Sequence, residues 1–460
     1  MGAPTTPYGA AVHLFDPFAP EPDAGHYPDL VLCPHCRRDV PAGPRWVTWC
    51  EGCGWNALVG APEPATSGPS WASRWTARVR VRAARRVHAE LLAGGGTGSP
   101  WPRRAAVAVA VVVLALTVVQ VGLVLLWVVR GSGFWHWPLA VLLVLLLAAV
   151  LRGLVPPSLE RGRGAGPDEL SPDDAPALHA LVRDVADLVG VVPPRRLRLS
   201  TQDNAWVSRE LYGRHVDLTL GLVLWGRLSW DARLALLGHE LGHCLPRGGG
   251  HRAVHAAGLV LRGWLRVLWP SGYDVAVMRY RSRWDRSGGL IGGPVLVWLA
   301  TVLQRLAAVP ALLALVLLDR LEASASQRAE YAADVAAARV AGTPGAVALL
   351  SGLVDPRGWL TSVSSALRRD EDVWTALAVA GRRPARETAR LRRIARDETV
   401  RVDASHPPTA LRIDLLERLP RTGPAATMTP ERLAAVDREV EGLLRTRRRA
   451  LTDRLLESWV

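Results

Sequence analysis

The chain has 460 residues, enough for two or three domains, and 49% of them are hydrophobic, which is more than a purely soluble enzyme needs. A membrane component is therefore expected. The formal net charge of +14 comes entirely from arginine, because the sequence contains no lysine. These arginines cluster beside apolar runs, where positive charge sets membrane orientation, so no nucleic-acid partner is expected.

Residues 1–30 are rich in proline, alanine and acidic side chains and lack the apolar core of a signal peptide, which predicts a disordered cytoplasmic tail. Residues 31–60 contain two CxxC pairs, formed by Cys33, Cys36, Cys50 and Cys53. Four thiolates complete the tetrahedral coordination of zinc and leave no open position. The pattern predicts a structural zinc in a zinc-ribbon-like module, and the alternative is four buried cysteines without a metal.

Residues 61–104 are predicted to form a linker and a basic juxtamembrane helix. Residues 105–155 are predicted to hold two transmembrane helices, Ala105 to Val129 and Phe134 to Leu151. The first is an uncharged run of about 25 residues, which suffices to cross about 30 Å of hydrocarbon. Arginines gather at the outer ends of this pair, so the positive-inside rule places the N-terminus and the chain after Arg152 in the cytoplasm.

Residues 167–250 are predicted to form the first part of a catalytic domain. Helical periodicity extends over Ala175 to Leu188, and Trp230 to Cys244 is an apolar helix. Arg196 to Ser200 and Val216 to Leu220 alternate as strands do. A strand pair packed against the second helix is the expected arrangement.

The second of these helices carries an HExxH motif, with His239, Glu240 and His243. Residues four apart share a helix face, so both imidazoles can reach one zinc ion while Glu240 lies beside the water that the zinc activates. A glutamate in that place can accept the proton of the water and pass it to the leaving amine. The motif alone also occurs by chance in unrelated helices.

The third ligand decides the class of zinc site. A metzincin requires glycine and histidine where this chain has Pro246 and Gly249, so that class is excluded. The other solution is a glutamate from a later helix, and Glu330 in an ExxAD sequence supplies one. Asp334 lies on the same helix face and can accept the remaining N–H of a zinc-bound histidine. The alternative is an exposed Glu/Asp pair on an amphipathic helix.

Three sequences, HELGH, SQRAEYAAD and SHPPTALRI, occur here in the order found in the HtpX-like and CAAX prenyl protease-like membrane zinc metallopeptidases. The chain resembles that family from about Leu178 to Leu419. The resemblance implies a mostly α membrane protein with a zincin-like α+β domain, and a catalytic zinc held by His239, His243 and Glu330. It also implies that Glu240 is the catalytic base.

The same resemblance implies roles for residues outside these motifs. His406 would lie near the zinc and stabilise the tetrahedral oxyanion, with Arg412 supporting its loop. The alternative for His406 is a turn residue before two prolines. Asn204, Ala205 and Trp206 resemble the family's segment ahead of a strand that lines the substrate cleft.

Residues 251–320 contain two further apolar stretches, Val254 to Pro270 and Leu290 to Leu318, before the second catalytic part at 321–460. Glu330 must meet His243, so the number of membrane crossings between them is even. The resemblance implies four spans in all, and two spans with a membrane-lying hairpin are the alternative.

The sequence predicts a multi-pass membrane endopeptidase, with its N-terminus and catalytic site in the cytoplasm. Its expected partners are polypeptide substrates and the lipid bilayer, and its oligomeric state is not predicted. The expected function is hydrolysis of unfolded or membrane-associated proteins, which fits the family's association with membrane-protein quality control. The alternative is a non-catalytic scaffold that acts through the zinc-ribbon module, although a scaffold needs no general base.

Overall fold

The structure is a computed structural model that describes thirteen segments of the chain: residues 29–42, 47–57, 71–94, 101–133, 136–152, 169–209, 216–245, 250–269, 293–354, 359–382, 385–397, 406–426 and 428–447. The predicted tail before residue 29, the linker at 61–70, and the residues after 447 lie outside these segments. Over the described residues the fold is mostly helical, as predicted from the sequence, and it contains two small sheets.

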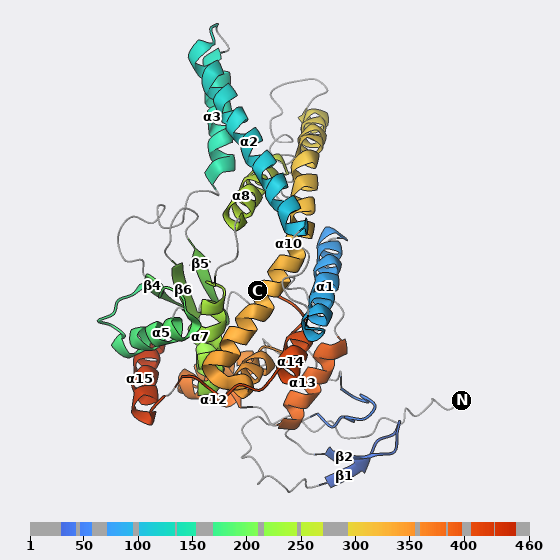
Figure 1. The fold of residues 1–460 in the computed structure, drawn as a ribbon, viewed down its shortest axis with the longest axis vertical. Coiled ribbons are helices and arrows are strands. Elements are labelled where there is room, and N and C mark those ends of the chain that lie inside the picture. The colour runs from blue at the N-terminus through green and yellow to red at the C-terminus, as the bar shows by residue number, and fades with distance from the viewer. Residues whose placement is uncertain are drawn as a thin grey trace.

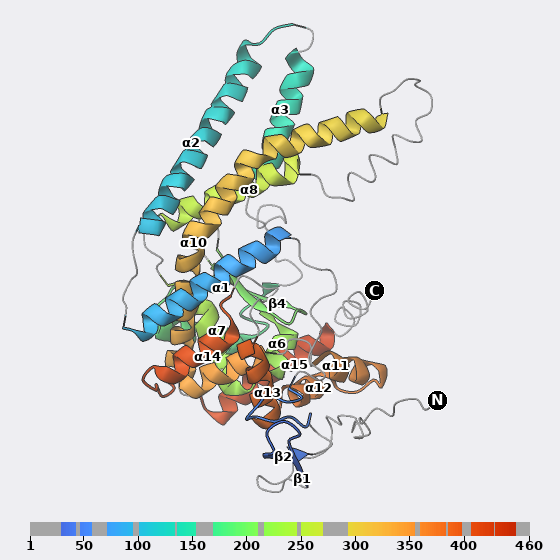
Figure 2. The same cartoon turned by 90° about the vertical axis from the view of Figure 1, so that its right-hand side faces the viewer.

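Two helices extend together from the rest of the molecule (Figures 1 and 2). They are α2 (Trp101–Arg130) and α3 (His136–Leu151), which agree closely with the two predicted transmembrane segments. Large apolar side chains on both helices are exposed, among them Leu116 on α2 and Leu142 on α3. Contiguous exposed apolar surface of this kind marks a membrane or partner-binding surface.

Helix α10 (Gly293–Gly352) joins this extended part to the catalytic part, because it runs as 60 residues across a kink at Gly342. The sequence predicts two separate segments here, an apolar stretch and the helix of Glu330. Its first half lies beside α2 and α8 and exposes apolar side chains such as Leu306. By length and composition, α2 and the part of α10 from Trp298 are the two described helices that could cross a membrane.

Helix α8 (His251–Leu268) corresponds to the third apolar stretch, and it packs against α2, α3 and α10. Gly250 stands just before α8. A Cβ added to it would lie 2.3 Å from Cγ2 of Val107, so the backbone here packs closely against the start of α2. Gly263 would meet the carbonyl oxygen of Val150, near the end of α3. Helix α8 therefore packs against both α2 and α3.

The catalytic part contains a four-stranded sheet in the order β3-β4-β6-β5, larger than the predicted strand pair. The predicted strands are β4 (Arg196–Ser200) and β6 (Val216–Gly221), which pair in parallel. The additional strands are β3 (Glu169–Leu170) and β5 (Ala205–Arg209), and both pair antiparallel to their neighbours.

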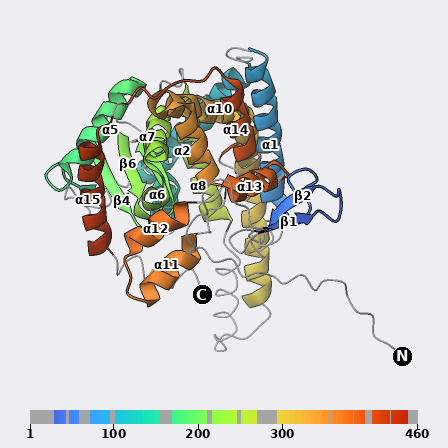
Figure 3. The same cartoon turned by 90° about the horizontal axis from the view of Figure 1, so that it is seen from below.

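One hydrophobic core joins this sheet to the surrounding helices. Buried leucines of the sheet, such as Leu218, pack with α5 (Pro176–Val189) and α7 (Trp230–Gly242). The remaining helices of this part are α6 (Leu222–Arg227), α11 (Trp359–Arg368), α12 (Val373–Gly381), α13 (Ala385–Asp397), α14 (Thr409–Arg418) and α15 (Pro430–Thr446). Figure 3 shows them grouped around α7 and the second half of α10.

Helices α7 and α10 approach each other closely through glycines of α7. A Cβ on Gly238 would lie 3.0 Å from the Cα of Ala337, and one on Gly242 would lie 2.9 Å from the Cα of Ala333. Because Gly238 and Gly242 flank His239 and Glu240, this contact sets the distance between the HExxH motif and the helix of Glu330.

We expect Gly242→Ala to lower the melting temperature and the zinc content, because the added methyl group must push the backbone of α10 away. Overpacking of this kind typically costs about 1–3 kcal/mol. The control is Gly442→Ala on α15, where an added Cβ meets nothing within 4 Å. That control is expected to keep wild-type zinc content, and an equal loss in both variants would contradict the assigned role of the contact.

The N-terminal module and α1 (Trp71–Leu92) pack on the catalytic part. The module has a β-hairpin of β1 (Asp29–Leu32) and β2 (Asp39–Ala42). Helix α1 lies across α10 and α14, where Val87 forms a buried cluster with Tyr331 and Leu415. The predicted juxtamembrane helix therefore also covers the catalytic helices, which its sequence did not reveal.

Candidate active site

Helix α7 presents the HExxH motif at its C-terminal end. Ser229 caps its N-terminus by accepting a hydrogen bond from the backbone N–H of Ala232, and the acidic Asp231 follows in the first turn. The two histidines stand one turn apart on one face, so that Nε2 of His239 lies 3.2 Å from Nε2 of His243.

Helix α10 brings Glu330 to the same point. One carboxylate oxygen of Glu330 lies 3.8 Å from Nε2 of His239, and the other lies 3.6 Å from Nε2 of His243. Burial by itself would raise the pKa of Glu330, but a hydrogen bond from His406 and the nearby histidines lower it to about 2. Glu330 is therefore an ionised carboxylate enclosed by imidazoles.

Asp334, one turn after Glu330, faces the other nitrogen of the first histidine. Its Oδ1 lies 3.1 Å from Nδ1 of His239. Arg412 of α14 binds the same carboxylate with two hydrogen bonds, of 2.6 and 2.8 Å. Burial would raise the pKa of Asp334, but Arg412 holds it well below its usual range. A charged aspartate thus fixes His239 with Nδ1–H as donor and leaves the Nε2 lone pair pointing at Glu330.

This arrangement gathers electron-pair donors around one point. The Nε2 atom of His239 faces the Nε2 atom of His243 and a carboxylate oxygen of Glu330 at 3.2 to 3.8 Å. Tetrahedral zinc with bonds of about 2.0–2.1 Å places its ligands about 3.3 Å apart. Lone pairs at such distances repel one another unless a cation lies between them. The set of ligand atoms and its spacing therefore fit a zinc ion.

Glu240 lies beside this cluster and is buried, with 7% of its surface exposed. Burial raises its pKa to about 7, against the opposing effect of His239 and His406. A carboxyl group with a pKa near neutrality can both accept and return a proton.

His406 enters the site from the segment before α14. Its Nδ1 donates a 2.6 Å hydrogen bond to a carboxylate oxygen of Glu330. His239, Glu330 and His406 have ligand atoms within 4.8 Å of one another. The structure thus places His406 at the mouth of the cluster, with 39% of its side chain exposed.

The structure also places the other residues that the resemblance singles out. Arg412, implied to support the loop of His406, binds Asp334. Asn204 accepts a hydrogen bond from the N–H of Ala205, which is the first residue of β5, so the strand begins inside the predicted segment. Trp206 is half-buried on this strand.

The structure also identifies residues that sequence reasoning missed. Tyr331, next to Glu330, is buried and donates a hydrogen bond to the backbone carbonyl of Ala84 in α1. Gln327, one turn before Glu330, is 1% exposed, and its Oε1 has no hydrogen-bond partner among the described residues. Only its burial distinguishes Gln327 from a surface glutamine, and burial cannot be seen in the sequence.

A second metal-type cluster lies in the N-terminal module. The sulfur atoms of its four cysteines all lie within 4.8 Å of one another. The Sγ atoms of Cys33 and Cys53 are 3.5 Å apart, as are those of Cys36 and Cys50, and no disulfide is formed. Four sulfurs around zinc with bonds of about 2.3 Å stand about 3.8 Å apart, so this cluster also fits zinc.

An HExxH helix, an ExxAD helix and a buried aspartate behind the first histidine define a zinc metallopeptidase site of the glutamate-ligand type. The chain belongs to peptidase family M48, because the model of that family matches residues 172–419, more than half of its length. Membership of this family implies zinc-dependent metallopeptidase activity and polypeptide substrates. No curated protein and no solved structure matches the chain.

Proposed function

We propose that this protein is an integral-membrane zinc endopeptidase that cleaves unfolded or membrane-associated polypeptides at the cytoplasmic face, in membrane-protein quality control. The observation that carries the proposal is the convergence of His239, His243 and Glu330 from two helices, with Glu240 beside them. Membership of family M48 supports the same chemistry.

In this proposal His239, His243 and Glu330 would hold the catalytic zinc, and Asp334 with Arg412 orients His239. A zinc ion bound there would supply a Lewis acid for the scissile carbonyl and for the attacking water. Glu240 would accept the proton of the attacking water and return it to the leaving amine. His406, at the mouth of the site, donates a hydrogen bond to the oxyanion as charge develops on it.

The substrate is proposed to bind along β5. This strand is at the edge of its sheet, and among the described residues it pairs only with β6. An exposed edge can accept an extended peptide through backbone hydrogen bonds, which suits unfolded segments of any sequence. Asn204, Ala205 and Trp206 stand at the start of this edge and would contact the peptide.

Membrane embedding is proposed through α2, α3 and the first half of α10. Their apolar side chains are exposed in the isolated chain, as Leu123 on α2 and Leu313 on α10 show. Arg103 at the start of α2 and Arg152 after α3 stand at the ends nearest the catalytic part. The positive-inside rule therefore favours a cytoplasmic site.

The test uses bacterial membrane vesicles of defined orientation that contain the full chain. Inside-out vesicles are expected to cleave an added unfolded protein, and right-side-out vesicles are not, because the site faces the cytoplasm. Equal cleavage by both preparations, or cleavage by right-side-out vesicles alone, would contradict the proposed topology.

Removal of zinc from the inside-out vesicles is expected to abolish cleavage, and added zinc is expected to restore it. The reason is that the side chains clustered at His239 are electron-pair donors, which supply no Lewis acid of their own. Cleavage that persists after the chelator has removed all bound zinc would argue against the metallopeptidase mechanism. A chain that binds zinc and unfolded protein but never cleaves would favour the scaffold alternative.

A further inference from the structure

The four-cysteine module lies outside the region that matches family M48, yet it is packed against the catalytic part. Its two CxxC turns have the same backbone design. The N–H of Cys33 bonds the carbonyl of Arg38, and the N–H of Cys50 bonds the carbonyl of Trp55. Each turn contains a residue with positive φ, Arg37 at 58° and Gly54 at 76°. Two equivalent turns that direct four sulfurs to one point form a metal site.

The module has little core of its own. Its buried hydrophobic cluster consists of Cys33, Val40 and Cys50, with Trp55 partly buried against it. A chain segment this small needs a metal or a partner to fold, because it cannot bury enough apolar surface. The structure shows such a partner at α13, beside the module in Figures 1 and 3.

Arginines of α13 bind backbone carbonyls on both sides of the second CxxC turn. Arg386 donates a hydrogen bond to the carbonyl of Trp49, and its guanidinium lies over the ring of that tryptophan. Arg390 donates a 2.6 Å hydrogen bond to the carbonyl of Ala57. Trp49 and Ala57 flank the turn at Cys50, so the turn determines where both carbonyls lie.

Arg390 depends on this contact because it is buried, with 4% of its surface exposed. Glu387 neutralises its charge through two hydrogen bonds, and the carbonyl of Ala57 satisfies the remaining nitrogen. Loss of the module would leave a charged side chain at an uncovered surface and remove one of its acceptors. The sequence of α13 is therefore suited to being covered by the module.

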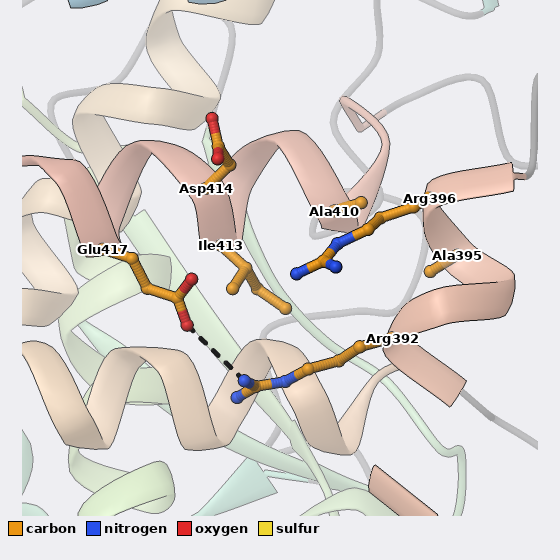
Figure 4. A pocket seen from close by; sticks show the side chains of 7 residues that line it. All are labelled: Arg392, Ala395, Arg396, Ala410, Ile413, Asp414 and Glu417. Carbon is orange, nitrogen blue, oxygen red and sulfur yellow. Dashed lines mark hydrogen bonds and ion pairs between the residues drawn. The ribbon is translucent and has the colours of Figure 1, made fainter. Parts of the chain in front are cut away.

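The opposite side of α13 contacts the helices that carry the catalytic part. Arg392 donates hydrogen bonds of 2.6 and 3.0 Å to the hydroxyl oxygen of Ser351 at the end of α10. It also pairs with Glu417 of α14 at 3.5 Å, the contact drawn in Figure 4. Helix α14 carries Arg412, which binds Asp334 behind the zinc-ligand cluster.

We propose that the cysteine module is a zinc-dependent docking module whose partner is α13 of the same chain, and that its bound zinc holds α13 and α14 in place behind the active site. The zinc is held by Cys33, Cys36, Cys50 and Cys53 and fixes the carbonyls of Trp49 and Ala57. Arg386 and Arg390 donate hydrogen bonds to those carbonyls. This inference goes beyond peptidase activity, and its test does not depend on cleavage.

The test measures amide hydrogen exchange in the full-length, detergent-purified chain. One variant carries Cys36→Ser and Cys53→Ser, a second carries Arg386→Gln and Arg390→Gln, and a third carries all four changes. The control is Arg445→Gln on α15, an exposed side chain that pairs with Glu441. Bound zinc is measured in each protein.

The expected result is faster exchange in α13 and α14, by about tenfold or more, in both double variants, because hydrogen bonds from charged groups are lost. The cysteine variant is expected to lose one zinc ion per chain, and the arginine variant is expected to keep it. The quadruple variant is expected to exchange in α13 and α14 no faster than either double variant, since both pairs of residues act through one contact.

The proposal would be overturned if α13 exchanged at the wild-type rate in the cysteine variant. It would also be overturned if the effects of the two double variants added up in the quadruple variant. If the cysteine changes unfold the whole chain, exchange in α5 and α7 also rises, and the arginine variant then decides. Wild-type exchange of α13 in the arginine variant overturns the proposal in that case. A failure here leaves the peptidase proposal intact, because that proposal is tested by cleavage.

Discussion

Glu240→Gln is expected to reduce peptide hydrolysis by about 10²–10⁴-fold, the usual contribution of a general acid or base. Glutamine has nearly the shape of glutamate, but it cannot accept the proton of the attacking water. The side chain is buried beside His239 and Glu330 without being placed as a ligand, so the variant is expected to keep its catalytic zinc. The measurement is the cleavage rate of an unfolded protein, together with bound zinc.

The matched control is Glu371→Gln, which removes an exposed carboxylate paired with Arg369. This control is expected to cleave at the wild-type rate. If Glu240→Gln cleaves as fast as the wild type, the base must be another residue. If it loses the catalytic zinc, the loss of activity says nothing about proton transfer, and Glu240 instead has a role in metal binding.

Arg412→Gln is expected to destabilise the chain by about 3–5 kcal/mol, the typical cost of removing one partner of a buried ion pair. The Asp334 carboxylate is 1% exposed and would be left without its counter-charge. Catalytic zinc affinity is expected to fall by about 10–100-fold as well, because His239 loses a fixed orientation. The measurements are the thermal melting temperature and zinc titration in detergent.

Two further variants separate this role from simple loss of charge. Arg412→Lys retains the charge but cannot donate the paired hydrogen bonds, so it is expected to recover only part of the stability. The control is Arg418→Gln on the same helix, which removes an exposed pair with Asp414 and is expected to change little. If Arg412→Gln melts like this control, the buried pair does not stabilise the site.

The periodic elements were predictable because their signals are local. Apolar runs without charge predicted α2 and α3, with each helix boundary within a few residues of its observed position. Alternation predicted β4 and β6, whereas β3 was missed because two residues have no period. A strand near β5 was implied only by the family resemblance, and its start at Ala205 depends on pairing with β6. The HExxH spacing is also local, since four residues make one helical turn.

The sequence by itself determined the residue types of the site, the order of its motifs and the apolar segments, because each depends on neighbours along the chain. Only the tertiary structure decided that Arg412 binds Asp334 and that Arg390 binds the cysteine module, across 78 and 333 residues of sequence. Such pairings depend on how helices pack. A buried arginine and an exposed one are written with the same letter, and only the packing of the helices buries these two and gives them their partners.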